Sequence, residues 1–206
     1  MPTSAINCAN EFSRHLRRLE PTRRKMEHLL NTGVIVRRDI EQIYKGLYID
    51  AVCSFENFLE DLFIGLLVGR YTPSSRHIVP RVKFTSPIIA RDVILSGKRY
   101  VDWLPYNLTM ERAKAFFRNG RPFTTLTPTD RQLTEQICII RNALAHDSEY
   151  ANKIFEKKIV NSMALAPRDR NPSGYLRSEF RIAPVQTRFE NLTIEMSGIA
   201  RKLCTY

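Results

Sequence analysis

The chain has 206 residues, of which 43% are hydrophobic and 10% aromatic, so it can bury the core of a globular domain. Its 32 Lys and Arg against 21 Asp and Glu give a net charge of +11 and a pI near 9.8, which favours nucleic acid as a partner and, secondly, an anionic membrane surface. No run approaches the roughly 20 apolar residues of a membrane span, and residues 1–11 have no apolar signal region, so we expect a cytoplasmic protein with no membrane partner.

Cysteine usage argues against disulfides and metal ligation. The four cysteines, Cys8, Cys53, Cys138 and Cys204, are far apart and form no Cys-x-x-Cys or Cys–His set. Cys53 and Cys138 fall in apolar helical segments, where we expect buried free thiols. We therefore expect a reducing compartment, no metal site and no cofactor.

The first segment, residues 4–31, has mostly helical apolar spacing that Pro21 interrupts, which predicts either a kinked helix or a second helix starting there. It is the most basic part of the chain, through Arg14, Arg17, Arg18, Arg23, Arg24 and Lys25. These side chains form either a solvated helix face or a track for a phosphate backbone.

A long core helix is predicted over residues 34–68, because apolar residues recur there every three to four positions. Glu56 lies between Phe55 and Phe58 in its most apolar portion. A carboxylate beside a buried face needs a partner. Glu56 therefore either pairs with Arg141 or bonds to solvent or a lysine at the helix edge.

Residues 70–128 are expected to form an elaborated, proline-rich insertion with short helices over 88–100 and 109–119, the second capped by Thr109. Its aromatic residues are expected to pack rather than to stack on bases; they are Trp103, Tyr106, Phe116, Phe117 and Phe123.

The next predicted helix begins at Thr127 and Pro128, with Thr127 as cap and Asp130 near the exposed N–H groups, and ends around residues 146–150. A narrow apolar stripe along it consists of Leu133, Ile137, Ile140 and Leu144. Arg141, Asn142 and His146 lie on the flank of that stripe, and Ala143 and Ala145 leave room for another helix or a nucleic acid to approach.

The sequence pattern after this helix predicts a basic amphipathic segment over residues 152–163, a basic loop over 167–184 and a final helix over 185–204. The basic residues of this part that we expect to bind a nucleic acid are Lys153, Lys157, Lys158 and Arg177. The apolar spacing of the final helix predicts a docking face.

An Arg followed closely by a His is not by itself a signature, since Arg23 with His28 and Arg70 with His77 also fit that pattern. Arg141 and His146 differ because Asn142 is adjacent, small residues lie between, and the pair ends a well-patterned helix. This element resembles the Arg-x4-6-His motif of the HEPN superfamily.

Three further stretches resemble its RiboL-PSP-HEPN branch, and the likeness runs from about residue 34 to the C-terminus; the stretches are Arg38–Tyr44, Ser54–Phe63 and Gly174–Arg177. The resemblance implies an all-α, HEPN-like helical bundle with a long central helix and a proline-rich insertion between the core helices. We expect a single domain over residues 1–206.

The residue types suit metal-independent cleavage of RNA. The imidazole of His146 can act as base or acid near neutral pH, and Arg141 offers a permanently charged fork for phosphate oxygens. One His cannot easily be both acid and base, so we expect a homodimer whose facing flanks form a composite site, as in HEPN nucleases. Asn142 would orient a phosphate or the opposing His146, and Asp147 would bias the imidazole tautomer or merely end the helix.

By likeness to the family, the products carry a 2′,3′-cyclic phosphate and a 5′-hydroxyl. The sequence thus predicts an endoribonuclease of the toxin or phage-defence kind, with RNA and an antitoxin or regulatory protein as partners. The alternatives are a non-catalytic HEPN-like module that binds RNA or protein, and a DNA-binding regulator, for which no convincing helix-turn-helix pattern is present.

Overall fold

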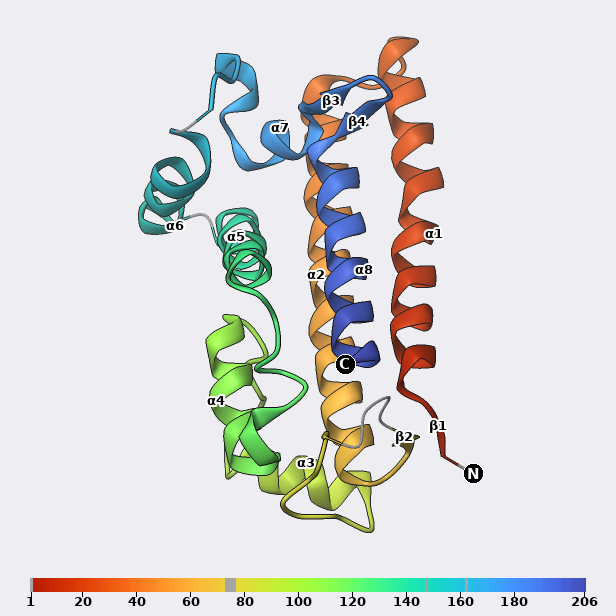
Figure 1. Ribbon diagram of the computed structural model, residues 1–206. Coiled ribbons are helices and arrows are strands. Elements are labelled where there is room, and N and C mark those ends of the chain that lie inside the picture. Colours follow the sequence, from red (N-terminus) through yellow and green to blue (C-terminus); the bar gives the residue numbers. More distant parts are fainter. Residues whose placement is uncertain (1, 73–76, 147, 162) are drawn as a thin grey trace. The chain divides into compact units, whose positions relative to one another are not determined.

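The computed structural model describes residues 2–72, 77–146, 148–161 and 163–206, and Figure 1 shows the chain coloured along the sequence. Its helices are α1 (Ala5–Asn31), α2 (Arg37–Leu67), α3 (Pro87–Leu95), α4 (Tyr106–Phe116), α5 (Pro128–Ala145), α6 (Glu149–Phe155), α7 (Pro172–Arg177) and α8 (Arg188–Thr205). Two short strand pairs accompany them, β1 (Thr3–Ser4) parallel to β2 (Tyr71–Thr72) and β3 (Glu179–Ile182) antiparallel to β4 (Val185–Thr187). The expected all-α fold is confirmed. None of the helices in the described ranges is both long and apolar enough to cross a membrane.

The chain forms two compact units. Unit 1 consists of residues 1–13, 55–135 and 197–206, and unit 2 consists of residues 14–54 and 136–196. Helices α1, α2, α5 and α8 contribute residues to both, so neither unit is one continuous stretch of sequence. The expectation of a single domain with an insertion at 70–128 stays a prediction.

Aromatic side chains form the core of unit 1. The ring centroid of Phe63 lies 5.0 Å from those of Phe117 and Phe123 and 5.2 Å from that of Trp103. Trp103 donates its indole N–H to Glu60 at 2.9 Å, so its polar atom is satisfied where the ring is buried. These aromatic residues of the insertion therefore pack, as expected.

The short helices of unit 1 differ in extent from the sequence prediction. Instead of covering residues 88–100, α3 ends early because Ser96 adopts a left-handed conformation with φ 47°. In place of a helix over 109–119, α4 begins three residues sooner, and Thr109 is not its cap. The buried hydroxyl of Thr109 instead donates to the carbonyl of Trp103 at 2.6 Å.

The start of α5 is held by a capping box, as predicted. The Thr127 hydroxyl accepts the N–H of Asp130 at 3.2 Å, and the Asp130 carboxylate accepts the N–H of Thr127 at 3.2 Å. Lys202 of α8 donates to the same carboxylate at 2.6 Å. Burial alone would raise the pKa of Asp130, but the bonds from Lys202 and Thr127 outweigh it and lower that pKa.

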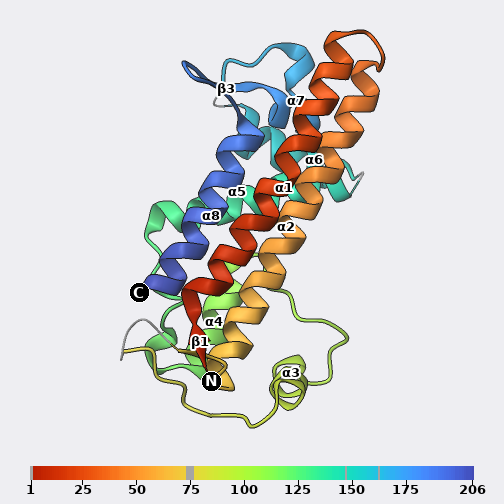
Figure 2. The same cartoon turned by 90° about the vertical axis from the view of Figure 1, so that its right-hand side faces the viewer.

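In unit 2 a buried arginine joins three helices. Arg23 of α1, 7% exposed, donates to Glu20 and to Glu190 of α8, each at 2.7 Å, and to the Tyr44 hydroxyl of α2 at 3.2 Å. Tyr44 in turn donates to Glu27 at 2.8 Å. Figure 2 shows these three helices side by side, as the contacts require.

Helix α1 continues through Pro21, so the alternative of a second helix starting there is wrong. Pro21 itself is exposed. The burial of Arg23 also means that the basic residues of this segment do not form one solvated face; those that are exposed are Arg14, Arg17, Arg18, Arg24 and Lys25.

Three of the four cysteines are buried, namely Cys8, Cys138 and Cys204, whereas Cys53 is exposed. The expectation of a buried Cys53 is therefore wrong. Each residue advances about 100° around a helix, which takes Cys53 off the buried side that Val52 and Phe55 share. The burial of Cys138 is as expected.

The stretch 167–184, expected to be a loop, contains α7 and strand β3, so that prediction is wrong. Asn171 caps α7 by accepting the N–H of Gly174 at 2.8 Å, and Pro172 occupies the first turn. A Cβ at Gly174 would lie 2.6 Å from the carbonyl oxygen of Arg168, so only glycine lets the preceding turn pack this closely. The docking face of α8 is confirmed, since its members are all buried; they are Phe189, Leu192, Met196, Ile199 and Leu203.

Candidate functional site

The motif segment of α5 lies in unit 2 and is anchored by its apolar stripe. Ile137 and Ile140 are fully buried and Leu144 is 5% exposed, as the predicted stripe requires. Tyr48 of α2 donates its hydroxyl to the carbonyl of Ile137 at 3.4 Å. Burial raises the pKa of Tyr48, so it remains a neutral donor. The last two turns of α5 are thus fixed against α2.

Arg141 and Asn142 lie on the flank of this stripe, both half-buried. The Arg141 guanidinium donates to the side-chain oxygen of Asn142 at 3.0 Å, and the Asn142 amide donates to the sulfur of buried Cys138 at 3.7 Å. Asn142 thereby orients the guanidinium. This contact within one chain differs from the expected roles of Asn142, which were to bind phosphate or an opposing His146 and which stay predictions.

His146 follows the last residue of α5 and is exposed. Its backbone N–H bonds to the carbonyl of Asn142 at 2.9 Å, so the residue still completes the final turn. The imidazole therefore lies at the surface on the turn that carries Asn142. Asp147, expected to support this imidazole, lies outside the described residues.

Glu56 is half-buried on the part of α2 that belongs to unit 1, whereas Arg141 belongs to unit 2. The expected pairing of Glu56 with Arg141 stays a prediction.

The lysines expected to bind RNA are exposed beside the motif in the sequence. Lys153 of α6 pairs with Glu149 at 2.6 Å, both largely exposed, so a phosphate could replace that carboxylate at little cost. Lys157 and Lys158 lie on the π-helical segment Glu156–Val160 that continues α6, and both are exposed.

Arg177, also expected to bind RNA, has its guanidinium committed within the protein. It donates two bonds to the Glu27 carboxylate, at 2.9 and 3.1 Å. This fork geometry is the strong form of an arginine–carboxylate pair. A contact between Arg177 and RNA would require that pair to open, and it stays a prediction.

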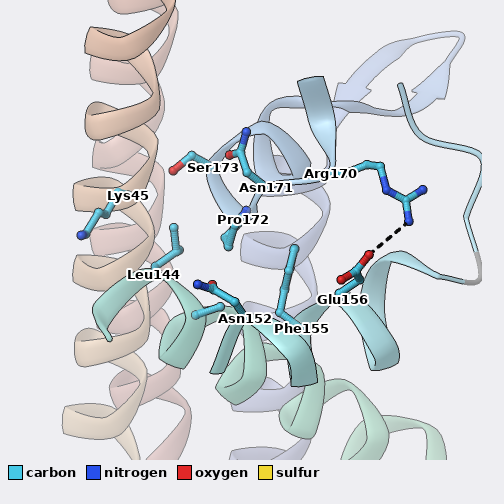
Figure 3. Close-up of a pocket in the computed structure, with 10 residues that line it drawn as sticks. Lys45, Leu144, Asn152, Phe155, Glu156, Arg170, Asn171, Pro172 and Ser173 are labelled. Carbon is cyan, nitrogen blue, oxygen red and sulfur yellow. Dashed lines mark ion pairs between the residues drawn. The ribbon is translucent and has the colours of Figure 1, made fainter. Parts of the chain in front are cut away.

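A cavity of about 560 Å³ adjoins the motif segment, within the range of about 300–1,000 Å³ typical of ligand sites. It is lined by Lys45, Ala143, Leu144, Asn152, Phe155, Glu156, Arg170, Asn171, Pro172 and Ser173. Figure 3 shows the side chains of Leu144 and Phe155 directed toward Pro172 of α7, and the side-chain amide of Asn152 extending toward Leu144. Helices α5 and α6 thus face α7 across the cavity.

Sequence reasoning missed this cavity, because its wall combines α2, α5, α6 and α7. It also placed Ala143 among the small residues of an approachable flank, whereas Ala143 is 8% exposed and lines the cavity. Ala145 is exposed, as that expectation required. The sequence did contain a signal for the start of α7, since Asn171 followed by Pro172 is typical of a helix N-terminus.

In chemical terms the motif offers an imidazole for proton transfer and a held guanidinium for an anionic group. Among the described residues no three or more His, Cys, Asp and Glu side chains are grouped to hold a metal ion.

No family model matches the chain, and the searches of curated proteins and of solved structures find no match either.

Proposed function

We propose that this protein is a metal-independent endoribonuclease of the HEPN type. The observation that carries the proposal is the last turn of α5, where the exposed His146 follows an Arg141 guanidinium that Asn142 orients. The net charge of +11 supports a polyanionic substrate, and the exposed lysines of α6 and its π-helical continuation supply phosphate contacts next to the motif in the chain.

The reaction needs two proton transfers and one displacement. One imidazole removes the proton of a ribose 2′-hydroxyl, the 2′-oxygen attacks the adjacent phosphorus, and the bond to the departing 5′-oxygen breaks. A second imidazole protonates that oxygen, which leaves a 2′,3′-cyclic phosphate and a 5′-hydroxyl. Arg141 stabilises the charge that grows on the phosphate oxygens in the transition state.

Two imidazoles require two copies of His146. We therefore propose a homodimer in which the two α5 ends face each other across a twofold axis. The small, exposed Ala145 between the motif residues leaves room for this approach.

The test is cleavage of labelled RNA by the purified protein in EDTA. Wild-type protein is expected to give fragments with 5′-hydroxyl ends, and His146→Ala is expected to lower the rate by at least about 100-fold, the usual scale of a lost acid–base group. His28→Ala is the matched control, because His28 is exposed on α1 and outside the motif. Cleavage that survives in His146→Ala would contradict the assignment.

Other outcomes of these experiments distinguish between the two alternative functions. RNA binding without cleavage would support a non-catalytic HEPN-like module, and equal affinity for duplex DNA with no effect of Arg141→Ala would support a DNA-binding regulator. In its host, a cytoplasmic toxin or phage-defence nuclease needs restraint, so we also propose an antitoxin or regulatory protein as partner. A small antitoxin-like gene beside this one would support that role.

A further inference from the structure

We infer that the cavity beside the motif binds one nucleobase of an RNA strand and thereby sets which nucleotide is chosen, an inference that rests on the proposed ribonuclease function. The cavity and the motif share α5, because Ala143 and Leu144 line the cavity wall between Asn142 and His146 in the chain. A nucleotide seated there would contact the same part of α5 that carries the residues proposed to act on its phosphate.

The walls of the cavity suit a flat heterocycle. Half-buried Pro172 supplies apolar surface from α7, and the largely buried Leu144 and Phe155 form the apolar floor opposite it, as Figure 3 shows. Phe155 is 2% exposed and its ring meets that of Tyr175 edge to face, with centroids 5.7 Å apart, so its orientation is fixed. Unpaired bases of single-stranded RNA bind to apolar and aromatic protein surfaces of this kind.

Two polar side chains at the cavity are available to read a base edge. The side-chain amide of Asn152 and the hydroxyl of Ser173 bond to no side chain or backbone group within the described ranges. Asn171, by contrast, already bonds within the protein through both its oxygen and its nitrogen, because it accepts the N–H of Gly174 at 2.8 Å and donates to the Arg168 carbonyl at 3.2 Å. An amide offers both a donor and an acceptor, which is what recognition of a base edge requires.

The charges around the cavity favour an uncharged group inside it. The guanidinium of Arg170 lies 3.8 Å from the Glu156 carboxylate and donates to Asn161 at 3.3 Å, so the two charges largely offset each other. In Figure 3 the amino group of Lys45 points away from Asn152 and Ser173. A phosphate would therefore bind outside the cavity and a neutral base inside it.

The experiment measures binding of four labelled tetranucleotides, A4, C4, G4 and U4, by fluorescence anisotropy at one fixed salt concentration. The 206-residue His146→Ala protein is used so that no RNA is cut. We expect the tetranucleotide with the highest affinity to bind about tenfold more tightly than the one with the lowest affinity, the scale of one good base-edge contact. Asn152→Ala in the same background is expected to reduce this spread of affinities to about threefold or less.

Asn152→Asp sharpens the test, because a carboxylate only accepts hydrogen bonds. It is expected to weaken U4 relative to A4 and C4, whose bases present amino groups. Ser173→Leu fills the cavity from the half-buried end of α7 and is expected to reduce the spread as Asn152→Ala does. Asn10→Ala, an exposed position on α1, is the matched control and should keep the original order.

Equal affinities for the four oligonucleotides, or a preference unchanged by both Asn152→Ala and Ser173→Leu in proteins that still fold by circular dichroism, would overturn the inference. Cleavage by wild-type protein without base preference would leave the proposed ribonuclease intact and remove the base site. Base preference in a wild-type protein that cuts no RNA would keep the base site and contradict the proposed ribonuclease.

Discussion

At the scale of single residues, Arg141 is the position where the contribution of a planar guanidinium to cleavage can be separated from the contribution of its positive charge. Its guanidinium donates to the Asn142 oxygen at 3.0 Å, which fixes the plane of the fork.

Arg141→Lys keeps the positive charge and loses the planar fork, so we expect the fold to persist and cleavage to fall by about 10- to 100-fold, less than for Arg141→Ala. Initial rates on labelled RNA measure the effect, with exposed Arg99→Lys as the matched control. Full activity in Arg141→Lys would argue against a two-pronged phosphate contact.

Asp130 gives a prediction about pH. Its folded-state pKa is lowered, because the bonds from Lys202 and Thr127 outweigh the effect of burial. The carboxylate therefore contributes stability that is complete above the unfolded pKa of about 3.9 and is lost as the pH falls through the lower folded value.

Asp130→Asn is expected to lower the free energy of unfolding by about 1.5 kcal/mol at pH 7, the scale of a lost helix cap and charged bond. The difference from wild type should shrink as the pH falls below about 4, where the wild-type carboxylate also becomes neutral. Urea unfolding at pH 7 and pH 3 measures both values. Asp92→Asn, exposed on α3, should change neither.

At the scale of elements, the bonds of Arg23 join α1, α2 and α8 within unit 2. Arg23→Leu would leave Glu20, Glu190 and the Tyr44 hydroxyl without their shared donor, so we expect a loss of about 3 kcal/mol of unfolding free energy. Arg24→Leu is the control, because Arg24 pairs with the same Glu20 carboxylate from a side chain that is 73% exposed. A cost of about 0.5 kcal/mol or less is expected there. Similar costs for the two variants would show that the buried bonds add little.

The exposed lysines of α6 and the π-helical segment are expected to act as phosphate contacts. Replacing Lys153, Lys157 and Lys158 by Gln should weaken RNA binding and reduce the slope of log affinity against log salt by about 2, since each single-stranded phosphate contact contributes about 0.7. Titrations at several salt concentrations measure the slope. An unchanged slope would place the phosphate track on another surface.

The sequence predicted the long elements well and the short ones poorly. Helices α5 and α8 repeat apolar residues over many turns, so Ile140 and Met196 are recognisable as buried from local pattern alone. Helix α7 and the β3–β4 pair are short, and their conformation depends on contacts with distant segments, such as that between Arg177 of α7 and Glu27 of α1.

The same contrast applies to the site. Arg141, Asn142 and His146 are close in sequence and could be proposed from it. The cavity wall could not, because Lys45 and Ser173 are far apart in sequence and meet only through folding.

At the scale of the whole molecule, the proposed activity depends on self-association through the α5 ends. Ala145 is exposed, so Ala145→Trp should leave the fold intact and hold two facing flanks apart. Light scattering is expected to show a shift from dimer to monomer, with a parallel loss of cleavage. An unchanged dimer would place the interface elsewhere, and Ala115→Trp, exposed on α4, controls for the bulk of the indole.

The winding of the chain between its two compact units limits how the gene can be divided. Each unit draws on separated segments, and α1, α2, α5 and α8 pass from one to the other in mid-helix. A truncation that stops anywhere between residues 14 and 196 would remove part of both. Expression of either half alone is therefore expected to yield aggregated or degraded product.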